Sequence, residues 1–88
     1  MSEATNLKFN VITAISNSDH EESVAALLHT QGCNIVYRAL DLQSLERFLK
    51  DCLLEVSIII SKDFTSVKDF IRISNIYNKY KFIQSDSK

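Results

Sequence analysis

The run Val56-Ser57-Ile58-Ile59-Ile60-Ser61 decides the fold of this 88-residue chain. It is short, apolar and rich in β-branched residues, which is typical of a strand buried on both faces of a parallel sheet. The earlier stretch Phe9-Asn10-Val11-Ile12-Thr13-Ala14-Ile15-Ser16 has the same character, because its apolar residues do not alternate with polar ones. Two strands of this kind predict a sheet that helices cover on both sides.

Helical patterns separate these strands. Ser18 is followed three residues later by Glu21, which is the spacing of a capping box, and Gly32 stands where a helix C′ residue needs positive φ. These signals predict a helix that Ser18 caps and that ends before Gly32. A second helix is expected after the cap residue Asp41, with apolar residues at the 3.6-residue period as far as Cys52.

A third helix is expected after Thr65 or Ser66, because either hydroxyl can cap it. Two further short runs predict strands: 33–40 alternates in the manner of a strand at or near a sheet edge, and 81–84 is a short fourth strand. The expected apolar side of the third helix comprises Val67, Phe70, Ile71, Ile73, Ser74, Ile76 and Tyr77.

The predicted order of elements is therefore β-α-β-α-β-α-β with short connections. Right-handed crossovers give a parallel sheet of spatial order 2-1-3-4 with helices on both faces. This is the front part of a flavodoxin-like α/β three-layer sandwich, whose complete sheet has about five strands. We therefore expect a single domain over residues 9–84 that is either truncated or a fragment of a longer protein, with a flexible N-terminus over 1–8 and a frayed C-terminus over 85–88.

The composition and charge of the chain limit the classes of protein to which it can belong. Hydrophobic residues make up 45% and charged residues 24% of the sequence, which is the balance of a globular domain. No apolar run approaches the about 20 residues of a bilayer span, and the first residues are polar, so we expect no membrane insertion, no signal peptide and a cytoplasmic location. Residues 1–55 carry a net charge of −4 and residues 56–88 a net charge of +3. We do not expect nucleic-acid binding, but the basic second half keeps it as an alternative.

Motifs for cofactors and metals are missing from the sequence. The chain has a single glycine and neither a GxGxxG nor a P-loop motif, so no loop can cradle a nucleotide phosphate. Cys33 and Cys52 have no CxxC spacing and no histidine at ligand spacing, which excludes a zinc site within one chain. We expect both cysteines to be small buried side chains, and the protein to need no cofactor.

Polar residues follow the first and the third expected strands. Ligands of open α/β sheets gather at the carboxyl ends of the strands where the strand order reverses. The two loops there hold Ser16, Asn17 and Asp19, and Ser61 and Asp63. A divalent cation would find only Asp19 and Asp63 as anchors, so we expect no metal site.

A catalytic alternative uses the same loops. Ser61 could act as a nucleophile if His20 accepted its proton and if Asp19 or Asp63 oriented His20. The glycines of a nucleophile elbow are missing around Ser61. We therefore expect Ser61 to be a polar residue that ends its strand, His20 to face water in the first turn of a helix, and the chain not to be an enzyme.

The predicted topology and the run Val56-Ser57-Ile58-Ile59-Ile60-Ser61 resemble those of response-regulator receiver domains, and the strings VITAIS (11–16), ALDLQSLERFL (39–49) and EVSIIIS (55–61) belong to the same pattern. Receivers place two adjacent acids directly after the first strand and the phospho-accepting aspartate at the end of the third. The matching positions here are Ser16-Asn17 and Ser61, so both halves of the acidic pocket are missing.

The resemblance therefore implies a pseudo-receiver without phosphorylation chemistry. The same strings are similar to the N-terminal domains that precede MinD/ParA-type ATPases of the CpaE/TadZ group, which help to position pilus-assembly or septum machinery. The degenerate pocket implied by this resemblance comprises Ser16, Asn17, Asp19, Ser61 and Asp63.

A non-catalytic interaction or localisation domain is the function that the resemblance implies. It would be the N-terminal regulatory module of a MinD/ParA-like ATPase that acts in pilus assembly or in septum or chromosome positioning; a stand-alone adaptor of a signalling system is the alternative. The expected partner is another protein or a second copy of the chain, which would give a dimer. Phe70 and Tyr77 fit a helix core as well as a surface. The expected interaction surface comprises Phe64, Phe70, Ile73, Tyr77 and Tyr80.

Overall fold

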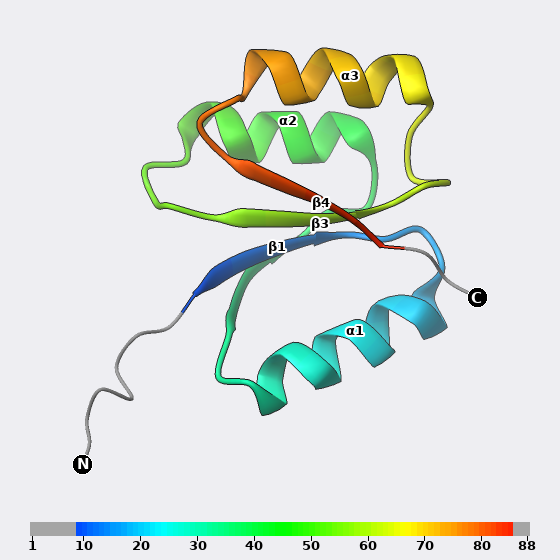
Figure 1. Cartoon of the computed structure of the whole chain (residues 1–88), viewed down its shortest axis with the longest axis vertical. Helices are drawn as coiled ribbons and strands as arrows, with labels where there is room; N and C mark the ends of the chain where they lie inside the picture. Colours follow the sequence, from blue (N-terminus) through cyan, green and yellow to red (C-terminus); the bar gives the residue numbers. More distant parts are fainter. Residues whose placement is uncertain (1–8, 86–88) are drawn as a thin grey trace.

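Four parallel strands form one sheet in the order β2-β1-β3-β4 in the computed structural model, which describes residues 9–85 (Figure 1). This arrangement confirms the predicted α/β fold class and strand order. The third strand is central, since it pairs with β1 on one side and with β4 on the other. The strands are β1 (Asn10–Ala14), β2 (Asn34–Arg38), β3 (Ser57–Ser61) and β4 (Lys81–Ser85).

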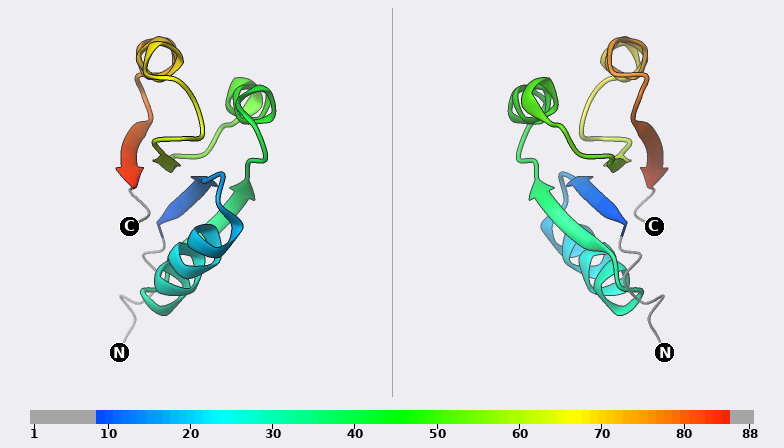
Figure 2. Two further views of the ribbon diagram at one scale, coloured as in Figure 1. Left: turned by 90° about the vertical axis from the view of Figure 1, so that its right-hand side faces the viewer. Right: turned by 90° about the vertical axis from the view of Figure 1, so that its left-hand side faces the viewer.

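Three helices connect the strands and form two layers around the sheet. Helices α2 and α3 lie side by side over one face, and α1 lies against the other face, along β1 and β2 (Figures 1 and 2). Among residues 9–85, no helix is long and apolar enough to cross a bilayer. The helices are α1 (Ser18–Thr30), α2 (Leu42–Asp51) and α3 (Val67–Ile76).

The main core lies between the sheet and the layer of α2 and α3. Ile58 and Ile60 of β3 alternate with Ile59, so both point into this layer and are fully buried, whereas Ile59 points to the other face and is half-buried. Tyr80 adds its ring to the core, and its hydroxyl donates a hydrogen bond of 3.0 Å to the backbone carbonyl of Cys52. The most deeply buried large side chains are Ile12, Leu45, Ile58, Ile60 and Ile73.

The ends of the helices agree with the sequence signals, with one correction. Asn17, and not Ser18, is the N-cap of α1, because its backbone is extended and its Oδ1 accepts a hydrogen bond of 2.8 Å from the His20 N–H. Ser18 is already the first helical residue. Asp41 caps α2 in a reciprocal capping box with Ser44, as its position predicts.

The end of α1 and the start of α3 also follow the sequence. Gly32 has a φ of 81°, the left-handed conformation that was predicted for this position after the helix. Of the two candidates for the cap of α3, Ser66 fills the role, since its hydroxyl accepts a hydrogen bond of 3.1 Å from the Asp69 N–H.

The apolar side of α3 is narrower than the sequence pattern predicts. Val67, Ile71 and Ile76 are 75%, 53% and 59% exposed, so only part of the expected stripe faces the sheet. A helix that touches a single layer can bury about one flank, and the remaining apolar residues point outward. The opposite correction applies to Ile73 and Tyr80: they are buried in the core and do not contribute to a surface.

The chain ends need one correction as well. The predicted flexible segment 1–8 lies outside the described residues, as does the part of the predicted frayed end that covers 86–88. Ser85 was assigned to that frayed end, but it is the last residue of β4 and pairs with Ser61. The strand is one residue longer than expected because the ladder with β3 continues to its last residue.

We expect Leu45→Ala to lower the free energy of unfolding by about 2–5 kcal/mol, because it removes a fully buried side chain and leaves a cavity in the main core. Leu40→Ala is the matched control: the same substitution at a side chain that is 90% exposed should change stability by less than about 0.5 kcal/mol. Urea denaturation of both variants measures the difference. Equal stability of the two variants would show that α2 does not cover this core.

Candidate functional site

The polar residues predicted after β1 and β3 meet at the carboxyl edge of the sheet. The backbone N–H of Ser16 donates a hydrogen bond of 3.2 Å to Ser61 Oγ, and the Ser61 hydroxyl donates one of 2.8 Å to Asp63 Oδ1. The two loops are therefore joined, as their positions after neighbouring parallel strands predict. We call the set Ser16, His20, Ser61, Asp63 and Ser85 the carboxyl rim.

Asp63 is held in its charged form by this rim. Its pKa is lowered first by a hydrogen bond from the Ser16 side chain and then by the bond from Ser61, and the nearby His20 contributes a smaller electrostatic effect in the same direction. Ser61 itself is 4% exposed, so its hydroxyl is held in place between the two loops. The rim therefore presents a carboxylate at its surface with a buried hydroxyl beneath it.

His20 contacts a residue that the sequence analysis did not place in the site. Its Nε2 lies 3.0 Å from Ser85 Oγ, at the end of β4. The expected water-facing position is therefore only partly correct, since the side chain is half-buried. A signal for Ser85 was available in the sequence, because it follows the predicted fourth strand and the carboxyl ends of parallel strands meet at one edge.

The hydrogen bonds of the rim differ from those of a catalytic triad. Nucleophilic catalysis requires a base that accepts the proton of Ser61, with a third group that orients the base. Here the Ser61 hydroxyl donates to Asp63, and the His20 ring is engaged with Ser85. The rim thus brings Ser61, His20 and Asp63 to one edge without forming the Ser61–His20 hydrogen bond.

The other two predicted pocket residues lie next to the rim. Asn17 uses its side-chain oxygen to cap α1. Asp19 is exposed in the first turn of the same helix, where a negative charge favours the helix dipole. Within residues 9–85, no three His, Cys, Asp or Glu side chains are grouped closely enough to hold a metal ion.

A second polar contact behind the rim attaches α1 to the sheet. Thr13 is fully buried in β1, and its hydroxyl donates a hydrogen bond of 3.0 Å to Glu21 Oε2 on α1. The same carboxylate oxygen lies 3.4 Å from Arg38 Nε at the end of β2. This contact satisfies the buried hydroxyl and sets the position of the first turn of α1, from which His20 reaches Ser85.

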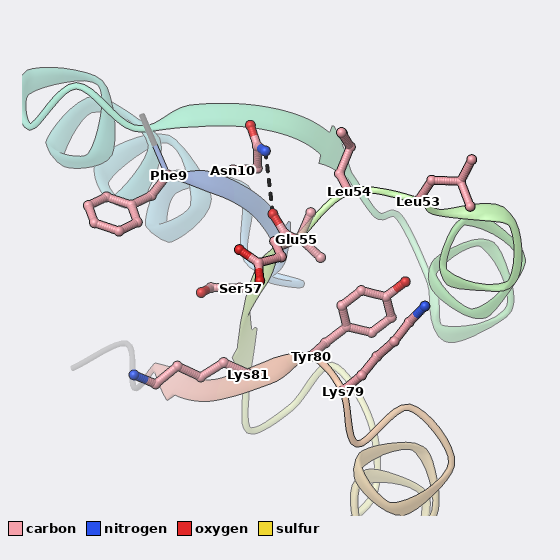
Figure 3. A pocket seen from close by; sticks show the side chains of 10 residues that line it. Phe9, Asn10, Leu53, Leu54, Glu55, Ser57, Lys79, Tyr80 and Lys81 are labelled. Carbon is pink, nitrogen blue, oxygen red and sulfur yellow. Dashed lines mark hydrogen bonds between the residues drawn. The ribbon is translucent and has the colours of Figure 1, made fainter. Parts of the chain in front are cut away.

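A groove lies at the opposite, amino-terminal edge of the sheet. It has a volume of about 480 Å³ and is drawn in Figure 3. The loop between α2 and β3 forms one wall, and Lys79 lies alongside the Tyr80 ring on the other, 5.0 Å from its centroid. We call this feature the amino-edge groove; it is lined by Phe9, Asn10, Leu53, Leu54, Glu55, Val56, Ser57, Lys79, Tyr80 and Lys81.

Large apolar side chains are exposed around the amino-edge groove. Leu53 is 96%, Phe9 69% and Leu54 49% exposed. In residues 9–85 the ammonium groups of Lys79 and Lys81 have no carboxylate within ion-pair distance. The groove therefore combines exposed apolar side chains with two lysines that have no ion-pair partner in the described part of the chain and with the exposed carboxylate of Glu55.

Three of the aromatic and basic residues of the second half, Phe70, Phe82 and Arg72, make contacts within the fold. Phe70 and Phe82 pack edge to face in the core layer, with ring centroids 6.1 Å apart. Arg72 makes two hydrogen bonds, of 2.9 and 3.2 Å, to the carboxylate of Glu46 on α2 and lies 3.5 Å from Asp69. Helix α3 is therefore bound to α2 through the guanidinium of Arg72.

Of the two cysteines, Cys52 is buried as expected and Cys33 is only partly buried.

Comparisons of the chain with protein-family models, curated proteins and solved structures find no significant match. The carboxyl rim and the amino-edge groove are therefore the features from which a function can be inferred. The rim is polar and internally hydrogen-bonded, and the groove is open and lined by both exposed apolar residues and polar or charged ones.

We expect Ser61→Ala to raise the pKa of Asp63 toward its ordinary value, because the carboxylate loses one of its two side-chain hydrogen-bond donors. Carbon-13 NMR titration of the side-chain carboxyl measures the shift, and Ser23→Ala, an exposed position on α1, should leave it unchanged. The lowered pKa stabilises the folded state above the unfolded-state pKa of Asp63, and this contribution is lost as the pH falls through the folded-state pKa. An unchanged pKa in Ser61→Ala would show that Ser61 does not donate to Asp63.

Proposed function

We propose that this chain is a non-catalytic, receiver-like interaction domain that binds another protein through the amino-edge groove. The single observation that carries the proposal is the exposure of Leu53, Leu54 and Phe9 around a groove with unpaired lysines. Exposed apolar residues that are gathered around a concave site are typical of interaction surfaces, whereas scattered ones are ordinary.

The chemistry of the groove supports a partner segment that is acidic and apolar. A bulky apolar side chain would bury surface against the exposed Leu53, Leu54 and Phe9, and burial of apolar surface is the largest source of binding free energy in such contacts. A neighbouring carboxylate would meet Lys79, whose ammonium is already held over the Tyr80 ring. The hydrogen bond from Asn10 Nδ2 to the Glu55 carbonyl, 3.4 Å long, connects β1 with the loop that carries both leucines.

The carboxyl rim supports a non-catalytic role. Receiver phosphorylation needs an aspartate at the end of the third strand and Mg²⁺ bound by flanking carboxylates, and Ser61 and Ser16-Asn17 occupy the matching positions. The remaining carboxylate, that of Asp63, accepts two side-chain hydrogen bonds. These bonds connect the loops that follow β1 and β3. The rim therefore has a stabilising role at the position where a receiver has its reaction centre.

The resemblance to domains that precede MinD/ParA-type ATPases supports a more specific role, as a regulatory module that positions such an ATPase. The acidic, apolar segment that the groove accepts would then belong to the ATPase or to the machinery that it positions. Titration of the isolated chain against a MinD/ParA-type ATPase from the same source, with ATP hydrolysis as the readout, tests this role. No change in the rate of hydrolysis at saturating domain would favour the stand-alone adaptor.

We expect no stable phosphoryl group on the chain after incubation with a small-molecule phosphodonor and Mg²⁺, because no carboxylate occupies the end of β3 and the Asp63 oxygens are engaged. Intact-mass spectrometry makes the measurement, with a typical receiver domain as the positive control. Stoichiometric acyl phosphate on this chain would refute the non-catalytic assignment.

We expect the Leu53→Asp variant to lose binding of the partner protein, and the Leu40→Asp variant to bind it as the wild type does. Both leucines are at least 90% exposed, so neither substitution disturbs the core, but only Leu53 lines the groove. Quantitative co-purification from the native source compares the two variants with the wild type, and circular dichroism checks that both are folded. A partner that both variants bind equally would locate the interaction elsewhere.

A further inference from the structure

The two edge strands of the sheet differ in how well they can accept another strand. Along β2 the register shifts: Val11 pairs with Ile35, but the next residue, Ile12, pairs with Tyr37, so Val36 is an extra residue in the ladder. Such bulges twist an edge strand and protect it from further pairing. Strand β4 has no such irregularity, since its five residues pair in an unbroken register with β3. The open edge of the sheet is therefore β4.

Helix α3 presents an apolar flank above this edge. One side of α3 faces the sheet, where Phe70 packs on Phe82. A second side faces α2, where Arg72 binds Glu46. Successive residues turn by about 100°, so Val67 and Ile71 lie together on a third side, away from α2. Figure 2 shows that, of the two helices over this face, α3 lies nearer to β4 than α2 does, so the side of α3 that faces away from α2 is the side toward the β4 edge. We call Val67 and Ile71, which are 75% and 53% exposed, the α3 ridge.

We propose that two copies of the chain associate by antiparallel pairing of their β4 strands about a two-fold axis at Ile83, which makes one eight-stranded sheet and brings their α3 ridges into contact. This inference rests on the proposed function, since it names a second copy as one partner of the interaction domain. A two-fold axis gives an isologous contact that closes on itself, so the association stops at a dimer.

The α3 ridges are correctly placed for such an axis. Phe70 contacts Phe82, which is next to Ile83, so Ile71 lies near the level at which the axis crosses the sheet. Neighbouring strands are about 4.8 Å apart, and helices over adjacent strand pairs are then separated by the 8–10 Å of ordinary helix packing. Val67 and Ile71 of both copies would fill this space and lose their exposure to water.

Charge complementarity on the other face of the sheet selects this register. Phe82 faces α3, so Lys81, Ile83 and Ser85 alternate onto the opposite face, where Ser85 meets His20. In the antiparallel register, Lys81 of one copy lies directly across from Ser85 of the other, and Ser85 is next to Ser61 in the ladder. The ammonium of Lys81 then reaches the carboxylate of Asp63, which Ser61 holds in place.

Each copy therefore completes the carboxyl rim of the other. Asp63 remains charged because its pKa is lowered, and in the dimer the ammonium of Lys81 from the other copy joins His20 of its own chain near this carboxylate. The half-buried Ile59 and the 41% exposed Ile83 lie beside this contact, on the part of the sheet that α1 does not cover. Apolar contact and ion pairing thus favour the same arrangement.

Sedimentation equilibrium up to millimolar concentration tests the dimer. We expect a monomer–dimer equilibrium for the wild type and an increase of about tenfold or more in the dissociation constant for Ile71→Arg, which places a charge in the α3 ridge. Ile76→Arg is the matched control, because Ile76 is 59% exposed on the same helix but outside the ridge. A wild type that stays monomeric throughout, or equal weakening by both variants, would overturn the inference.

A charge exchange tests the register. Lys81→Glu and Asp63→Lys should each weaken the dimer, and the double variant should restore much of the wild-type dissociation constant, because the ion pair between copies forms again with reversed signs. Two weakened single variants without restoration would refute the antiparallel register. A monomeric chain that still binds a partner in a Leu53-dependent manner would refute only the dimer, whereas acyl phosphate on the monomer would refute the proposed function.

Discussion

Burial of Ile58 and Ile60 beneath α2 and α3 is the interaction on which the rest of the structure depends. These side chains hold the middle strand of the sheet, and the ladders to β1 and β4 follow from its position. The same strand carries Ser61 to the carboxyl edge, where the hydroxyl joins the loop after β1 to Asp63. Burial on one face of β3 thus positions the polar contacts at its end.

The asymmetry of the layers explains where interaction surfaces can form. Two helices cover one face of the sheet, while on the other face α1 lies mainly along β1 and β2 and reaches β4 through His20 at its first turn (Figure 2). Ile59 and Ile83, which are paired in the ladder, therefore remain partly open to water. A flavodoxin-like sheet with about five strands would cover this region with further elements, and here a partner can take their place. The partly open face of the four-stranded sheet is thus one structural ground for the proposed interaction role.

The hydrogen bonds of the carboxyl rim serve a structural purpose, because they join the loops after β1 and β3. Ser16 and Ser61 stand where the resemblance to receivers predicts acidic residues. Their hydroxyls donate hydrogen bonds to the carboxylate of Asp63 and stabilise its charged form. Hydrogen bonds to a charged group are stronger than those between neutral groups. The connection between the two loops is therefore a favourable structural contact in itself, which is consistent with a domain whose function lies in binding.

The sequence by itself determined the order of strands and helices, the burial of β3, the cap at Asp41 and the turn at Gly32, because these depend on periodicity and on hydrogen bonds between close neighbours along the chain. It left the cap of α3 open between Thr65 and Ser66, and the structure assigns it to Ser66. The sequence also predicted that the loops after β1 and β3 meet. Only the tertiary structure decided which flank of α3 faces the sheet and that His20 reaches Ser85, 65 residues away. The physical reason is that the rotation of a helix on a sheet and the alignment of distant strands result from packing among elements, and no local pattern of residues encodes such packing.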